Sequence, residues 1–123
     1  MEIFDVIKEM IADILDIDDQ EITPETYIVR DLGAESIDLL ELAVSMNSRF
    51  KVDVNDGEIF LTRLREYVTE AEEESRDVVP HLVDLLPFLT EGRIEEIIQD
   101  LEGGPTLKVR DLVSYIEWQL TKN

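Results

Sequence analysis

Apolar residues recur at intervals of three and four positions in three stretches of this chain of 123 residues. This spacing is the period of an amphipathic α-helix, and it predicts helices at residues 3–16, 36–50 and 109–120. Between the first two, from residue 17 to residue 34, no long periodicity survives, and we expect a long ordered loop. Such a set of helices predicts an all-α fold in which the apolar faces share one core.

The helix predicted at residues 36–50 follows Gly33, which favours a turn at little steric cost. Asp38 and Glu41 are expected on its polar face, where the charge near the N-terminus favours the helix dipole. Two interpretations of Ser36 are open: its hydroxyl caps the helix start, or it carries a phosphate group there. The apolar face is predicted to consist of Ile37, Leu40, Ala43, Val44, Met46 and Phe50.

Three further patterns lie between residues 58 and 105. The segment 78–89 is apolar but contains Pro80 and Pro87, which interrupt a helix interior. The run Gly103-Gly104-Pro105 is a helix-stop signal. The patterns before and after the proline-containing segment consist of Phe60, Leu64, Tyr67, Val68 and Ala71, and of Ile94, Ile97, Ile98 and Leu101.

Composition narrows the classes of function. Thirty acidic residues against eleven basic ones give a formal net charge of −19, so nucleic acids and anionic membranes would repel the chain. Partners with basic patches suit this charge. No apolar run approaches the ~20 residues that span a bilayer, and the acidic start Met1-Glu2 does not resemble a secretory signal, so we expect a cytoplasmic protein.

Candidates for catalysis or metal binding are weak. The chain contains no cysteine, and its one histidine, His81, has no second histidine with which to share a metal. Acidic residues from Asp16 to Glu21 suggest calcium, but Glu21 and Tyr27 occupy the positions where an EF-hand needs glycine and glutamate. We therefore expect no metal site and no enzyme activity.

The run of residues 31–42 is the most specific feature of the sequence. It reads Asp-Leu-Gly-Ala-Glu-Ser-Ile-Asp-Leu-Leu-Glu-Leu, which resembles the prosthetic-group attachment motif of the acyl carrier proteins. Glu35 stands in place of the usual aspartate and Ile37 in place of the usual leucine, so charge and apolarity are kept. The resemblance implies that Ser36 receives 4′-phosphopantetheine from coenzyme A through a phosphodiester.

By the same resemblance, the protein is a carrier that holds an acyl intermediate as a thioester for partner enzymes. Its pathway would be the synthesis of fatty acids or of specialised lipids, such as long-chain, lipid A or other envelope lipids. The alternatives are a peptidyl, aminoacyl or polyketide carrier, and an unmodified acidic interaction module. Partners would be a phosphopantetheinyl transferase and acyl synthetase, ketosynthase or acyltransferase enzymes with basic patches.

The resemblance also assigns roles to individual positions. Glu35, Asp38 and Glu41 would form the acidic face that partner enzymes recognise. Where the family usually continues with glutamates, this chain has Asn47, Ser48 and Arg49, which indicates a dedicated set of partners. The residues that fall where the family lines its acyl pocket are Ile28, Val29, Met46 and Val54.

The family usually has only one short helix between its second and last helices. We therefore predict that residues 1–123 form a single acyl-carrier-like domain and that residues 58–105 are a helical insertion within it. This insertion would extend or cover the acyl cavity, bury a small core of its own, or expose an apolar patch for a partner or a second copy.

Overall fold

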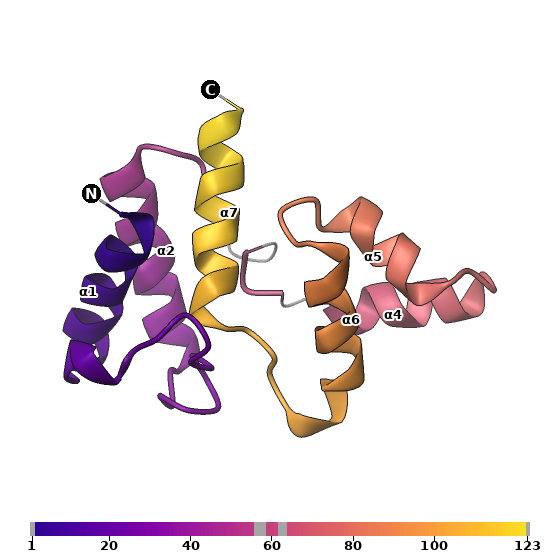
Figure 1. Cartoon of the computed structure of the whole chain (residues 1–123), viewed down its shortest axis with the longest axis horizontal. Helices are drawn as coiled ribbons and strands as arrows, with labels where there is room; N and C mark the ends of the chain where they lie inside the picture. The colour runs from indigo at the N-terminus through magenta and orange to yellow at the C-terminus, as the bar shows by residue number, and fades with distance from the viewer. Residues whose placement is uncertain (1, 56–58, 62–63, 123) are drawn as a thin grey trace.

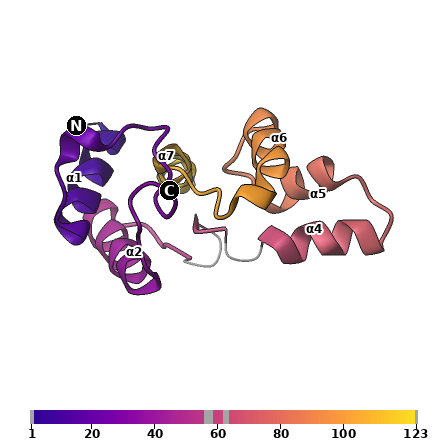
Figure 2. The ribbon, with the colours of Figure 1, turned by 90° about the horizontal axis from the view of Figure 1, so that it is seen from below.

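The computed structural model describes residues 2–55, 59–61 and 64–122, and its helices form two groups (Figure 1). The first group, here called the main bundle, consists of α1 (Ile3–Leu15), α2 (Ser36–Phe50) and α7 (Val109–Thr121). The second, here called the side lobe, consists of α4 (Leu64–Glu73), α5 (Val78–Leu85) and α6 (Glu91–Gln99). Figure 2, turned by 90°, separates the same two groups. The short 3₁₀ turns are η1 (Asp19–Glu21) and η2 (Leu101–Gly103).

The all-α prediction is confirmed. Within the described ranges the only β-type pairing is an isolated bridge between Tyr27 and Lys108. The observed bounds of the three main helices lie within a few residues of those predicted from the sequence. Over the same ranges, none of the helices has the length and apolar character to cross a membrane.

The main bundle has a fully apolar centre. Helix α1 packs against both α2 and α7. Ile7, Ile11 and Met46 are almost completely buried, together with Leu112 and Ile116 of α7. Burial of side chains of this size provides most of the stabilisation of such a bundle, about 1.5–3 kcal/mol for each.

The apolar face of α2 differs from the prediction. Leu42, Ala43 and Met46 form the buried face. Ile37, Leu40 and Val44, which were predicted to share one face with Ala43 and Met46, are instead 70%, 55% and 63% exposed. The helix carries apolar residues over more than half of its circumference, and only one of the two possible stripes faces α1. A second apolar stripe therefore lies on the surface, directly after Ser36.

The proline-containing segment forms a helix because of where its two prolines lie relative to α5. Pro80 is the third residue of α5, within the first turn, where its missing N–H has no partner inside the helix in any case. Pro87 comes after the end of the same helix. Thr90 then starts α6, because its side-chain oxygen accepts the Arg93 N–H at 3.1 Å. Of the two prolines, only Pro87 interrupts the helical pattern.

A buried ion pair joins the side lobe to the main bundle. Arg93 of α6 donates from Nε and Nη2 to the two carboxylate oxygens of Asp111 in α7, at 2.8 Å each. Nη2 also donates to the Thr106 carbonyl at 2.7 Å, and Asp111 accepts the Lys108 N–H at 2.9 Å. The exposed fractions of the two charged side chains are only 6% and 1%. A second contact with α7 comes from Phe88, which packs edge-on against Tyr115 with ring centroids 5.0 Å apart.

The long loop between α1 and α2 is held by the chain segment that leads into α7. The Thr26 and Pro24 carbonyls accept the N–H groups of Val109 and Arg110, each at 3.0 Å, and so satisfy two donors at the start of α7. Ile28 in turn donates its N–H to the Leu107 carbonyl at 3.1 Å. The loop that precedes Ser36 is therefore held in place by hydrogen bonds to residues that are distant in the sequence.

A second tie runs from this loop to Asp100, at the end of α6. The Tyr27 hydroxyl donates to its carboxylate at 2.7 Å, and Arg30 Nη1 donates to the same oxygen at 2.8 Å. Arg30 Nη2 also donates to the Gly104 carbonyl at 2.8 Å. The Tyr27 hydroxyl and then Arg30 hold the pKa of Asp100 below its ordinary value of 3.8.

This lowered pKa predicts an acid-dependent loss of stability. The ionised Asp100 stabilises the fold above its ordinary pKa, and the contribution is lost as the pH falls through the folded-state value. The difference in urea midpoint between the wild type and Asp100→Asn should therefore be largest near neutral pH and should narrow toward pH 3. Asp84→Asn, an exposed substitution in α5, is the matched control. A gap that stays constant with pH would show that the charge of Asp100 does not contribute.

Candidate functional site

The turn before α2 presents Ser36 to solvent. Gly33 adopts a left-handed conformation with φ of 71°, which only glycine adopts without strain, and its N–H donates to the Val29 carbonyl at 3.0 Å. The next residue, Ala34, is buried and anchors the turn to the core. The chain then emerges, and Ser36 is the exposed first residue of α2.

The helix cap belongs to the neighbours of Ser36 and not to Ser36 itself. Glu35 occupies the N-cap position, and Asp38 Oδ2 accepts its N–H at 2.8 Å. Across the described part of the chain, the Ser36 hydroxyl takes part in no hydrogen bond. The capping interpretation of Ser36 is therefore wrong. Its hydroxyl is available for modification, beside first-turn N–H groups and the positive end of a helix dipole, both of which favour a phosphate.

The predicted recognition residues surround this serine, but they differ in exposure. Glu35 and Glu41 are exposed, whereas Asp38 is half-buried and its carboxylate already accepts the Glu35 N–H. The second apolar stripe of α2, Ile37, Leu40 and Val44, lies among them. The surface next to Ser36 therefore combines carboxylates with three exposed aliphatic side chains. Sequence reasoning missed this combination because the stripe has the spacing of a core face.

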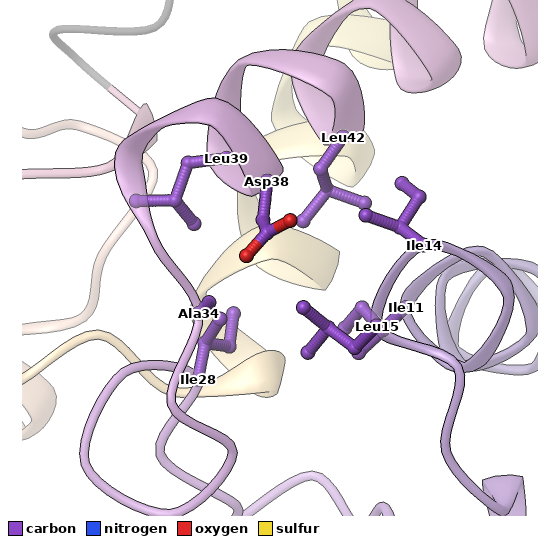
Figure 3. A pocket seen from close by; sticks show the side chains of 8 residues that line it. All are labelled: Ile11, Ile14, Leu15, Ile28, Ala34, Asp38, Leu39 and Leu42. Atoms are coloured by element: carbon purple, nitrogen blue, oxygen red, sulfur yellow. The ribbon is translucent and has the colours of Figure 1, made fainter.

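The predicted acyl-pocket residues do not line one common space. Ile28 lines a small cavity under the start of α2, of about 10 Å³, with Ala34, Leu39 and Leu42 (Figure 3). Asp38 points toward the same space, and side chains of α1 close its other side. A cavity of this size holds about one water-sized sphere. Without a rearrangement, it has no room for an acyl chain.

The other three predicted residues lie elsewhere. Val29 lines a larger open groove of about 460 Å³, whose other walls are formed mostly by the start of α4 and the segment before α7. Met46 is completely buried in the main bundle, and Val54 is half-buried; neither lines the cavity or the groove. Leu39, which lines both spaces, was not identified from the sequence because the prediction followed the stripe that begins at Ile37. Its spacing of three, four and seven residues from the buried Leu42, Ala43 and Met46 is the signal that could have identified it.

Side chains suited to metal binding or catalysis do not assemble into a centre. Among the described residues, no group of three or more histidine, cysteine, aspartate or glutamate side chains is placed to hold a metal ion. His81 belongs to α5 and faces α4, with Nε2 3.9 Å from the Glu70 carboxylate and only 8% of its side chain exposed. It packs within the side lobe and belongs to a different helix group from Ser36.

Comparison with known proteins addresses the same region. Residues 5–69, just over half of the chain, match the family model described as the phosphopantetheine attachment site. The acyl carrier protein of Clostridium perfringens is 39% identical over 75 residues, which cover 58% of this chain and 99% of that protein. The acyl carrier protein of Wolinella succinogenes is 38% identical over 58 residues, 47% of this chain and 76% of that protein. No solved structure matches the chain significantly.

The chain belongs to the acyl carrier protein family. The family resemblance in residues 31–42 is thereby confirmed. Acyl carrier proteins are not enzymes: they carry covalently bound 4′-phosphopantetheine and work with phosphopantetheinyl transferases and acyl-handling enzymes. The exposed, unbonded hydroxyl of Ser36 and the free N–H groups beside it fit a phosphodiester at this position.

Proposed function

We propose that Ser36 is the attachment site of the prosthetic group in this acyl carrier protein. The observation that carries the proposal is the hydroxyl itself, which is exposed at the first residue of α2 and engaged in no hydrogen bond within the described ranges. Its neighbours Gly33 and Asp38 hold the turn and the helix start in place, so the backbone that carries Ser36 is well positioned. When bound, the group supplies a terminal thiol that holds an acyl chain as a thioester.

The attachment step requires only one reacting group from this chain. The Ser36 Oγ attacks the β-phosphorus of coenzyme A while the bond between that phosphorus and the bridging oxygen of the diphosphate breaks. Adenosine 3′,5′-bisphosphate leaves with the electron pair of that bond, and a base of the transferase takes the hydroxyl proton. First-turn N–H groups of α2 stabilise the phosphodiester that results.

The surface around Ser36 suits enzymes with a basic rim and an apolar depression. Glu35 and Glu41 would meet the basic side chains, and Asp38 shares this acidic face although it also caps the helix. Ile37, Leu40 and Val44 lose water when a partner covers them, which adds a contribution that does not depend on salt. We propose that these partners belong to fatty acid or specialised lipid synthesis.

The side lobe is proposed to be an insertion within a single domain. In support, α1 and α7, which lie near opposite ends of the sequence, pack against each other. Helix α5 packs against both α4 and α6. The C. perfringens relative is matched over 99% of its length in 75 aligned residues, a stretch too short to include a gap the size of residues 58–105, so this match gives no support to the insertion. The family match runs to residue 69, so the first part of the predicted 58–105 range carries family-like sequence. Glu58, its first residue, lies outside the described residues.

The test is the intact mass of the purified protein before and after incubation with coenzyme A, magnesium and a phosphopantetheinyl transferase. We expect the wild type to gain one phosphopantetheine and Ser36→Ala to gain none. Ser48→Ala, which removes another exposed hydroxyl of α2, is the matched control and should load like the wild type.

Two outcomes would contradict the proposal. Loading of Ser36→Ala would place the attachment site elsewhere. Failure of the wild type with several transferases, while a standard carrier loads in the same reactions, would favour an unmodified interaction module that uses the same acidic and apolar surface.

A further inference from the structure

Two helices of the side lobe leave an open cleft between them. Helix α5 packs against both α4 and α6, but within the described residues α4 and α6 do not pack extensively against each other. The cleft between them has a volume of about 470 Å³. Its aliphatic residues, Val68, Ile98 and Leu101, are half-buried, whereas its glutamates, Glu72 and Glu102, are exposed. The cleft therefore has an apolar floor, formed by the three aliphatic residues, and an acidic rim, formed by the two glutamates.

The rim carboxylates have no partner in the part of the chain that the structure describes. Neither Glu72 nor Glu102 forms an ion pair or a side-chain hydrogen bond there, unlike the carboxylates that tie the lobe to the main bundle. Arg65 is the basic residue of the lining, and its Nη2 donates to the Leu101 carbonyl at 2.8 Å. Between residues 64 and 103, twelve acidic side chains stand against three basic ones. The rim therefore attracts cationic groups of another molecule.

The cleft continues toward Ser36. Arg65 and Leu101 also line the groove of about 460 Å³ that contains Val29. Leu39 lines the α2 side of that groove, three residues after Ser36 and so about one helical turn away. A protein that covers Ser36 therefore has a continuous surface along which it can reach the side lobe.

Shape and charge argue for one occupant of the cleft. Two helices on either side of an aliphatic floor accommodate a third helix, whose own apolar face covers that floor. The net charge of −19 would repel a second copy of this chain, and nucleic acids as well. We infer that the cleft binds a basic amphipathic helix of a partner enzyme, with aliphatic side chains on the floor and lysine or arginine side chains on the rim. Only the assignment of this partner to the enzymes that act at Ser36 rests on the proposed function.

A contact of this kind selects among partners. An enzyme that carries such a helix is held by two surfaces, and binding at the cleft raises the effective concentration of its active site at Ser36. An enzyme that lacks the helix engages only the surface around the start of α2. The side lobe therefore favours dedicated enzymes over those that recognise α2 alone.

The test uses the full-length Ser36→Ala protein, so that binding is measured without any group at this position. The probe is a synthetic peptide of about 12 residues, long enough to span α4, with leucine on one face of its helix and lysine on the other. A scrambled peptide of the same composition should bind about tenfold more weakly, because it presents no apolar face. We expect titration with the amphipathic peptide to shift most strongly the amide NMR signals of Val68, Thr69, Ile98 and Gln99.

Charge-matched variants separate the cleft from general attraction to an acidic protein. Glu72→Gln combined with Glu102→Gln should weaken binding about fivefold, as expected for the loss of two exposed ion pairs. Glu9→Gln combined with Glu117→Gln removes the same charge from exposed positions of α1 and α7. This control should stay within about twofold of the parent affinity, because its charges lie away from the cleft and are screened by salt.

Three outcomes would overturn the inference. Equal weakening in the two double variants would show only general electrostatic attraction. Signal changes confined to Ile37, Leu40 and Val44 would place the peptide on α2, and no binding would leave the cleft without this occupant. All four substituted glutamates are exposed, so we expect the variants to keep their fold. None of these results depends on phosphopantetheine loading of the wild type, whose failure would contradict the proposed function alone.

Discussion

Replacement of Arg93 by methionine is expected to lower the free energy of unfolding by about 3–5 kcal/mol, the range for breaking one side of a buried ion pair. The substitution keeps most of the volume of the side chain but leaves the Asp111 carboxylate buried without its partner, and Asp111 is only 1% exposed. It also removes the hydrogen bond to the Thr106 carbonyl. The measurement is urea unfolding followed by circular dichroism.

Arg110→Met is the matched control for this change. Arg110 pairs with Glu25 and Glu96 at the surface, so the same substitution should cost less than about 1 kcal/mol. A second comparison adds Asp111→Asn to Arg93→Met. Because it removes the unpaired charge, the double variant should lose less stability than the sum of the single changes. Equal costs at Arg93 and Arg110 would show that the buried pair is not a major tie between lobe and bundle.

Phe88→Ala is expected to destabilise the protein by about 3–5 kcal/mol, as for other large aromatic residues removed from a core. Phe88 is 7% exposed in the link between α5 and α6, where its ring contacts the rings of Tyr115 and Trp118 in α7. The substitution leaves a cavity between the side lobe and the main bundle. Leu85→Ala, which removes a partly exposed apolar side chain of α5, is the control and should cost much less.

Trp118 is the only tryptophan in the chain and lies at this contact, so its fluorescence reports on the junction. Circular dichroism reports on all helices. If lobe and bundle unfold as one cooperative unit, the two signals of Phe88→Ala change at the same, lowered urea concentration. An early change in Trp118 fluorescence with an unchanged helical transition would show instead that the lobe separates while the bundle remains folded.

The helices of the main bundle could be predicted because each has a clear local signal. Ile3 to Leu15 shows helical spacing of apolar residues, and the last helix follows the stop signal that ends at Pro105. Ser36 was located by the motif around it, since glycine, a small anchoring residue and acidic neighbours produce the observed turn. These features depend on residues within a few positions of one another, which a single sequence records.

The interactions between distant segments could not be predicted in this way. Nothing in the spacing of Arg93 and Asp111, or of Tyr27 and Asp100, indicates that they meet. Both pairs form only because the side lobe docks on the bundle. The same limitation explains α2: its pattern contains two apolar stripes, and which of them faces α1 is decided by packing. The position of Met46 in the core, away from both the cavity and the groove, follows from that choice.

Because α1 pairs with α7, we expect the main bundle to complete its fold only late in synthesis. This contact closes a loop that contains every other helix, and the entropy cost of such closure grows with loop length. Domains fold as the chain emerges from the ribosome, N-terminal part first, yet Ile7 and Ile11 keep apolar surface uncovered until α7 has been made. Within the side lobe, α5 contacts α4 and α6, which are its neighbours in the sequence, so we expect the lobe to form before α7 docks. A compact lobe would shorten the effective loop between α1 and α7 and so lower the entropy cost of their pairing.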